Sequence, residues 1–233
     1  MSFKEKNYLI IGASSGIGFA LAQSLIEAGA SVFTASRTQP DLRSTHITWD
    51  ALSPDNQDFT SLPATIDGLA YCPGTINLKP FNRFTIEDFQ KDFQINVLGA
   101  VNVIQAVLPK LKAAGNASVL LFSTVAVQTG MGFHASVATS KGAIEGLTRS
   151  LAAEYASSKI RFNAIAPSLT DTPLVKMLLS SPEKIDASNK RHPLGRIGTS
   201  ADITAAAKLL LSDEGSWITG QILHIDGGIG NLK

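Results

Sequence analysis

Short apolar runs alternate with longer stretches of helical periodicity along the whole chain. The apolar runs predict seven strands: 7–13, 30–36, 45–50, 66–72, 118–124, 160–167 and 221–228. Apolar residues at spacings of three and four predict the helices between them: 16–28, 85–112, 136–157 and 200–212. Strands that alternate with helices form parallel sheets covered on both faces. The pattern therefore predicts a single α/β domain over residues 1–233, doubly wound, with a parallel sheet of about seven strands.

Composition narrows the class of protein without naming its activity. Hydrophobic residues make up 44% of the 233 residues, charged residues 17%, and the formal net charge is +1. These values are typical of a globular protein and favour neither a nucleic acid nor a membrane as partner. The single cysteine, Cys72, excludes an internal disulfide and fits a reducing compartment. The apolar run before the first glycines is too short for a signal peptide or membrane span, so we expect a cytoplasmic protein.

A glycine-rich loop follows the first predicted strand and opens the first predicted helix. In "IGASSGIG" (11–18), Gly12, Gly16 and Gly18 allow a sharp turn and a close backbone approach to a pyrophosphate at the helix N-terminus. Ser14 and Ser15 can add hydroxyl donors. Such a loop can also be a purely structural turn, but the order strand, loop, helix favours a nucleotide site.

The end of the second predicted strand bears on the choice of cofactor. An NAD site commonly has an acidic residue there for the ribose hydroxyls, and this chain has Ser36 and Arg37 instead. A guanidinium can hold the 2′-phosphate of NADP by charge-assisted hydrogen bonds. We therefore predict NADP(H) over NAD(H). The alternative is that Arg37 is only a solvated surface residue.

Several motifs together resemble the short-chain dehydrogenase/reductase family over essentially the whole chain. They are "IGASSGIG" (11–18), "INVLG" (95–99), "IRFNAIAPSLTDTP" (160–173), "HPLGRIGTSADI" (192–203) and "ITGQILHIDGG" (218–228). The resemblance implies a Rossmann-type fold, hydride transfer between a nicotinamide cofactor and a carbonyl or alcohol, and a homo-tetramer or homo-dimer. It also implies a substrate lid at about 173–192, whose apolar residues Leu174, Met177, Leu178 and Leu179 suggest either an apolar wall over the substrate or a subunit interface.

The resemblance assigns a cofactor role to a set of residues along the chain. These are Gly12, Ser14, Ser15, Gly16, Ile17, Gly18, Ser36, Arg37, Asp50, Ala51, Gly74, Asn96, Lys141, Pro167, Leu169 and Thr172. Within this set, Asp50 resembles the family's adenine-contacting acid, and Asn96 its structural and proton-relay asparagine. Pro167, Leu169 and Thr172 would face the nicotinamide.

The catalytic residues that the resemblance implies are incomplete. The family places a serine or threonine after the fifth strand, a tyrosine about thirteen residues later and a lysine four residues beyond it. Laid on this chain without gaps, these positions are Thr124, Val137 and Lys141. The hydroxyl that normally serves as general acid/base is therefore missing, while Asn96, Thr124 and Lys141 remain.

The segment "YASSK" (155–159) has the spacing of the family's tyrosine–lysine pair but lies in the wrong place. Tyr155 is 18 residues beyond Val137, which is roughly 27 Å along a helix at about 1.5 Å per residue. It also continues an apolar stripe through Ile144, Leu147 and Leu151. We therefore expect Tyr155 to pack in the core.

Three functions stay open at this point. The first is a slow NADP(H)-dependent oxidoreductase, with proton delivery by water or by His134, the nearest titratable group; Ser123 and Ser136 are weaker candidates because an aliphatic hydroxyl needs a base beside it. The second is a non-catalytic NADP(H)-binding protein, such as a sensor or a silent subunit. The third is an active reductase in which valine was deliberately put in place of tyrosine.

Metal-ligand spacing of Cys or His is absent from the sequence, and Cys72 is expected to be a buried small hydrophobe.

Overall fold

A computed structural model of the chain describes residues 1–53 and 59–232. Its centre is a seven-stranded parallel sheet with the order β3-β2-β1-β4-β5-β6-β9. The strands are β1 (Asn7–Ile11), β2 (Ser31–Ser36), β3 (Thr45–Thr48), β4 (Gly68–Tyr71), β5 (Ala117–Phe122), β6 (Ile160–Pro167) and β9 (Ile222–Ile225). This confirms the predicted single-domain, doubly wound α/β fold, with every predicted strand present in a shorter or equal form.

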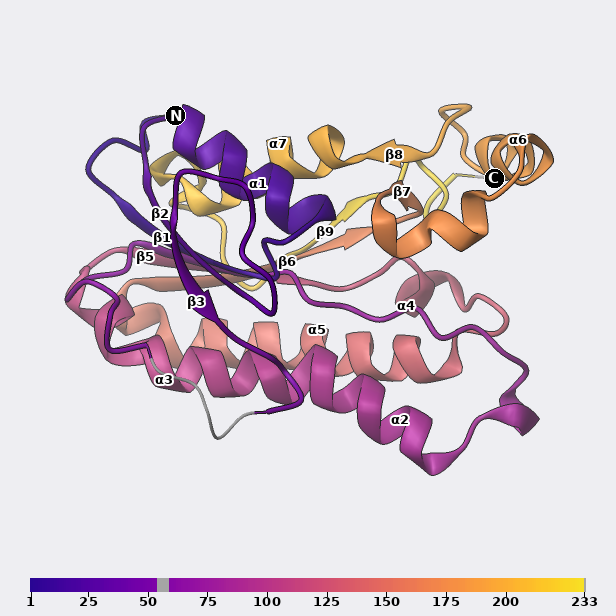
Figure 1. Ribbon diagram of the computed structural model, residues 1–233, viewed down its shortest axis with the longest axis horizontal. Coiled ribbons are helices and arrows are strands. Elements are labelled where there is room, and N and C mark those ends of the chain that lie inside the picture. The colour runs from indigo at the N-terminus through magenta and orange to yellow at the C-terminus, as the bar shows by residue number, and fades with distance from the viewer. Residues whose placement is uncertain (54–58, 233) are drawn as a thin grey trace.

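Helices cover both faces of the sheet (Figure 1). One face carries α1 (Gly16–Glu27) and α7 (Ser200–Leu211), and the other carries α2 (Ile86–Phe93), α3 (Gly99–Ala113) and α5 (Ala135–Tyr155). Side chains of β1 alternate between the two resulting cores. Leu9 packs with the α3 and α5 side, whereas Ile10 packs with the α1 and α7 side. Burial on both faces explains why the strands are almost continuously apolar in sequence.

The helix predicted over 85–112 is not a regular α-helix throughout. Five residues, Gln94–Leu98, form a π-helical segment between α2 and α3. Such insertions change the direction of nearby side chains and are frequent at functional sites. The segment contains Asn96, which is fully buried. An extra residue in one helical turn leaves the apolar spacing largely intact, so the sequence pattern does not reveal it.

The predicted lid at 173–192 contains regular structure that the sequence pattern missed. It consists of a 3-10 helix, Pro173–Leu179, followed by α6 (Pro182–Lys190). Ser181 caps α6 by accepting a hydrogen bond from the Lys184 amide. Two short strands, β7 (Thr170–Asp171) before the lid and β8 (Gly198–Thr199) after it, pair in parallel.

The remaining elements are short. One further helix is α4 (Ala126–Thr129), and 3-10 turns lie at Phe81–Arg83, Ala156–Ser158 and Asp213–Gly215. The expected brief linker between β3 and β4 has no helix in its described parts, 49–53 and 59–67; its residues 54–58 lie outside the described structure. Over the described ranges, no helix is both long enough and apolar enough to cross a bilayer.

Candidate active site

Two adjoining cavities open at the carboxyl ends of the central strands. The strand order reverses between β1 and β4, which is where ligands bind in open parallel sheets. One cavity, of about 610 Å³, begins at the glycine loop after β1, and we name it the cofactor groove. The second, of about 450 Å³, lies between the loops after β5 and β6 and residues of the predicted lid, 173–192, and we name it the inner cavity. Ile17, Cys72 and Gly74 line both cavities, so the two spaces adjoin.

Most of the predicted site residues line these two cavities. Those in the cofactor groove are Gly12, Ser14, Ser15, Gly16, Ile17, Gly18, Ser36, Arg37, Asp50, Ala51, Gly74 and Thr172. Those in the inner cavity are Ile17, Gly74, Thr124, His134, Val137, Lys141, Pro167, Leu169 and Thr172. Asn96 lines neither cavity and is buried behind Gly74. Folding therefore gathers into one region residues that are separated by most of the chain.

The glycine loop has the backbone geometry that only glycine tolerates well. Gly12 and Gly16 have φ angles of +80° and +59°. A side chain at Gly18 would collide with the carbonyl oxygen of Gly12. The loop consequently brings bare backbone and the N-terminus of α1 to the groove, an arrangement that favours an anionic group.

Arg37 is exposed at the end of β2, and within the described residues its side chain has no ion-pair partner. The neighbouring Ser36 hydroxyl donates to the carbonyl oxygen of Thr38, 2.9 Å away. On the other wall, Asp50 accepts a hydrogen bond from the Leu52 amide at 3.0 Å. A free guanidinium beside a groove that already favours anions can take a phosphate.

A buried cation and an unpaired amide oxygen both lie close to Gly74. The Nζ of Lys141 and the Oδ1 of Asn96 each lie 3.7 Å from the position that a Cβ on Gly74 would occupy. The Nδ2 of Asn96 donates to the Asp92 carbonyl (2.8 Å) and to Thr75 Oγ1 (2.9 Å), but within the described structure its Oδ1 has no partner. Buried polar atoms are nearly always hydrogen-bonded. Lys141, which lines the inner cavity, can therefore bind a polar ligand such as a sugar hydroxyl beside Gly74, whereas the Oδ1 of Asn96 is buried behind this position.

Burial lowers the pKa of Lys141 to about 8, because only 6% of the residue is exposed and the ammonium is poorly hydrated. Nearby Cys72 and Asp92 oppose this effect. Burial also raises the pKa of the Cys72 thiol to about 12. The thiol is then protonated at neutral pH, which disfavours a nucleophilic role. Cys72 is only partly buried and lines both cavities, so the expectation of a buried residue is not met.

Comparison with known proteins agrees with this arrangement. Residues 57–230 match the family model described as "Enoyl-(Acyl carrier protein) reductase". A tropinone reductase homolog of Arabidopsis thaliana is 31% identical, over 98% of this chain and 94% of its own length. The chain belongs to the short-chain dehydrogenase/reductase family.

Among solved structures, the aldohexose dehydrogenase of Thermoplasma acidophilum is similar with a TM-score of 0.93 at 28% identity, covering 99% of this chain and 96% of that one. A gluconate 5-dehydrogenase from Burkholderia cenocepacia in complex with NADP and tartrate has a TM-score of 0.90 at 27% identity, covering 100% and 98%.

Val137 occupies the wall of the inner cavity in this short-chain dehydrogenase/reductase. It lies on α5, one turn before Lys141, and is 6% exposed. Thr124 lines the same cavity, and its Oγ1 accepts a hydrogen bond from the Ala126 amide at 3.3 Å. Among the described residues that line either cavity, there is no tyrosine. A phenol that could protonate a substrate oxygen is therefore missing from this part of the structure.

Tyr155 and Lys159 lie away from both cavities. The ring centroids of Tyr155 and Phe162 are 5.9 Å apart. The Nζ of Lys112 lies 5.2 Å from the centroid of the Tyr155 ring. Lys159 is exposed, in a left-handed conformation after the end of α5. The expectation that Tyr155 packs on the core agrees with these contacts.

The hydroxyls near the Val137 position are mostly occupied. Ser136 donates to Asp92 at 2.6 Å, and Ser123 donates to Glu145 at 2.8 Å. The Nδ1 of His134 lies 2.6 Å from the carbonyl oxygen of Gly132, so this nitrogen carries the donated hydrogen. His134 lines the inner cavity and can offer a proton from Nε2 only as the imidazolium.

Sequence reasoning missed a serine–histidine pair in the wall of the inner cavity. The Nδ1 of His192 lies 2.8 Å from the Ser188 carbonyl oxygen, which can only accept, so Nδ1 donates. Its Nε2 lies 2.8 Å from the Ser168 hydroxyl oxygen, from which it accepts when the ring is neutral. His192 is 3% exposed. Twenty-four residues separate the pair, and only the fold brings them together.

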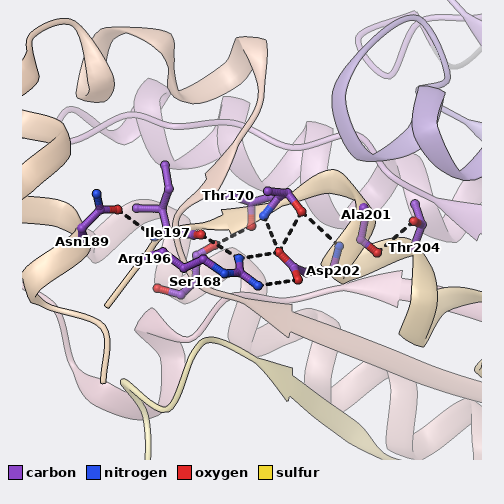
Figure 2. A network of polar contacts seen from close by, with 9 residues as sticks. Ser168, Thr170, Asn189, Arg196, Ile197, Ala201, Asp202 and Thr204 are labelled. Atoms are coloured by element: carbon purple, nitrogen blue, oxygen red, sulfur yellow. Dashed lines mark hydrogen bonds and ion pairs between the residues drawn. The ribbon is translucent and has the colours of Figure 1, made fainter. Parts of the chain in front are cut away.

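The C-terminal end of the lid is tied to α7 by the polar network in Figure 2. The guanidinium of Arg196 donates to both carboxylate oxygens of Asp202, at 2.7 and 2.8 Å. Asp202 also caps α7 with Thr199, and Asn189 accepts a hydrogen bond from the Ile197 amide at 2.9 Å. Arg196 and Thr199 hold the pKa of Asp202 well below its usual range. These contacts hold α6 and its following loop against the body of the protein.

Proposed function

We propose that this chain is an NADP(H)-dependent oxidoreductase that interconverts a carbonyl and an alcohol, slowly, because Val137 stands where a proton donor is needed. The observation that carries the proposal is the buried Lys141 Nζ in the wall of the inner cavity, with the unpaired Asn96 Oδ1 also close to Gly74. Keeping such groups desolvated is unfavourable unless a ligand satisfies them. Simple packing does not require them, whereas binding a dinucleotide ribose at the junction of the two cavities does.

Different residues would bind different parts of the cofactor. Gly12, Gly16 and Gly18 would admit the pyrophosphate at the N-terminus of α1, and Arg37 would hold the 2′-phosphate. Asp50 and Ala51 would lie against the adenine. Lys141 and Asn96 would bind the nicotinamide ribose, with Pro167, Leu169 and Thr172 beside the nicotinamide. When bound, the nicotinamide supplies or accepts the hydride.

The inner cavity supplies only part of what hydride transfer requires. Hydride arriving at a carbonyl carbon leaves negative charge on oxygen, which a donor must neutralise. The Thr124 hydroxyl can orient that oxygen, and the proton then comes from water or from His134. In this proposal, residues 173–192 form a lid over the substrate. Residues 1–233 form a single domain.

A second function stays open because no tyrosine lines the described part of the cavities. The chain can be an NADP(H)-binding protein without turnover, acting as a sensor or silent subunit. A deliberately introduced valine in an active reductase would give the same geometry. Thr124 and the nicotinamide-facing loop at 167–172 favour the oxidoreductase, because dinucleotide binding alone does not need a hydroxyl in the inner cavity.

Replacing Arg37 by aspartate tests the cofactor assignment. We expect Arg37→Asp to weaken NADPH binding by about 10²-fold or more, since it removes a charge-assisted contact and adds repulsion with the 2′-phosphate. NADH binding should change little or improve. Fluorescence titration of both cofactors measures this, with Arg43→Asp, outside the groove, as the matched control. Equal affinity of the unaltered chain for NADH and NADPH would contradict the NADP(H) assignment.

A further inference from the structure

The charged side chains that line the inner cavity all have the same sign. Among the described lining residues, the basic side chains besides the two histidines are Lys141, Lys184 and Arg191, and there is no aspartate or glutamate. The rest of the lining is largely apolar, with Leu78, Met131, Leu174, Val175, Leu178 and Ile229. A cavity with apolar walls and cations without counter-ions has the character of a site for an apolar molecule that carries negative charge.

Helix α6 turns one of its faces toward this cavity. Lys184, Ala187, Ser188 and Arg191 line it, at the spacing i, i+3, i+4, i+7 that puts residues on one side of a helix. The acidic residues of α6, Glu183 and Asp186, do not line the cavity. Asp186 pairs with Lys190 at 2.7 Å, away from the lining residues. The helix thus separates its charges: Lys184 and Arg191 are both solvent-exposed, and they lie at the rim of the cavity, where no acidic residue of α6 lines it.

These two cations have polar contacts but no acidic partner in the described structure. Lys184 Nζ donates to Ser180 Oγ at 2.9 Å, and Arg191 Nη2 donates to Ser188 Oγ at 3.3 Å. Arg196, only five residues from Arg191, is held by both oxygens of Asp202. Arg191 keeps most of its donors free, in a geometry that suits a carboxylate.

The cofactor's own phosphates are a less suitable partner for these cations. Neither Lys184 nor Arg191 lines the cofactor groove, although Thr172, Pro173 and Leu174 at the start of the lid do. Both ring nitrogens of His192 already have hydrogen-bond partners, Ser168 and Ser188. The anion that α6 faces is therefore expected to enter with the substrate.

We propose that the substrate of this chain is an oxo acid or hydroxy acid: a molecule with an apolar middle, whose carboxylate lies at the lid against Lys184 and Arg191. Its carbonyl or alcohol lies at Thr124. This inference rests on the proposed oxidoreductase function, because it names the substrate of the same cavity. It adds a specificity role for α6, which the sequence motifs do not assign.

The test compares pairs of ligands that differ only in charge. Straight-chain oxo acids and their methyl esters are titrated calorimetrically into the NADP⁺-loaded chain, and their kcat/KM values are measured with NADPH. We expect at least a tenfold preference for the acid, falling as salt is added. In the double variant Lys184→Met, Arg191→Met the preference should fall to near onefold, while NADPH affinity stays unchanged. Lys190→Met, on the same helix but outside the cavity, is the matched control and should keep the preference.

The outcomes separate this inference from the proposed function. Equal binding of acid and ester, or a preference that survives the double variant, overturns the carboxylate assignment. A double variant that loses NADPH affinity equally overturns it as well, because the cations then serve the cofactor. If acids bind selectively through α6 but are not reduced, the carboxylate site stands and the oxidoreductase proposal fails.

Discussion

Val137→Tyr is expected to raise carbonyl-dependent NADPH oxidation by about 10²- to 10⁴-fold, the usual contribution of a positioned general acid. Val137 lines the inner cavity one helical turn before Lys141, so a phenol there would reach into the same space as the Lys141 ammonium. A nearby cation lowers the pKa of a tyrosine and makes it a better acid/base near neutral pH. The cavity of about 450 Å³ has room for the ring.

Val137→Phe is the matched control for this gain. It adds the same ring without the hydroxyl, so it reports any effect of filling the cavity. Initial rates with saturating NADPH over a panel of aldehydes, ketones and oxo acids give the comparison. If tyrosine and phenylalanine give equal rates, or if the unaltered chain is already as fast as the tyrosine variant, Val137 is not the position of a missing acid.

Lys141→Met is expected to have two opposite effects. NADPH binding should weaken by about tenfold or more, since a cation that would hydrogen-bond the cofactor is removed. The cofactor-free protein should become more stable, because folding buries an ammonium without an ion-pair partner among the described residues. The depressed pKa of Lys141 puts this gain in the free energy of unfolding on the order of 3 kcal/mol.

The stability gain should depend on pH with a definite sign. Lys141 has a pKa of about 8 in the folded chain and an ordinary value of 10.5 when unfolded. Below about pH 8 it is charged in both states, and its destabilising effect is complete. Between pH 8 and 10.5 the folded state has lost its proton, so the advantage of Lys141→Met shrinks as pH rises and vanishes above 10.5.

Urea denaturation of the cofactor-free chain at pH 7 and above pH 10 measures this difference. Lys112→Met is the control, because Lys112 is exposed and lies over the Tyr155 ring, so its removal should cause a small loss of stability and no gain. A loss of stability in Lys141→Met at pH 7 would mean that Lys141 is not held as an unpaired buried cation.

The strands and the main helices could be predicted because their burial leaves a direct trace in the sequence. Strands buried on both faces are continuous apolar runs, as in β5 and β6, where nearly every residue is buried. Helix α6 leaves no such trace, since "PEKIDASNK" is mostly polar and only one of its residues, Ser188, is buried. The π-helical segment at Asn96 was not predicted for another reason, because its apolar spacing resembles that of an α-helix.

Residues that follow the ends of strands could be assigned to the site from sequence alone. The glycine loop, Arg37 and Thr124 each come directly after a strand, and parallel strands bring those ends together. The pair of Ser168 and His192 could not be found in this way, because it depends on how the lid folds back. The cationic face of α6 did have a signal, the spacing from Lys184 to Arg191, which becomes meaningful only once 182–190 is known to be helical.

The most direct test of the central claim is a single-turnover measurement on the unaltered chain. Enzyme in excess over NADPH is mixed with a panel of carbonyl compounds, and loss of the reduced nicotinamide is followed together with alcohol formed. The account predicts slow, carbonyl-dependent oxidation, with one alcohol formed per NADPH consumed and a rate far below that of Val137→Tyr. NADPH that binds but is never oxidised by any carbonyl, even after tyrosine is restored, would contradict the account and leave cofactor binding as the function.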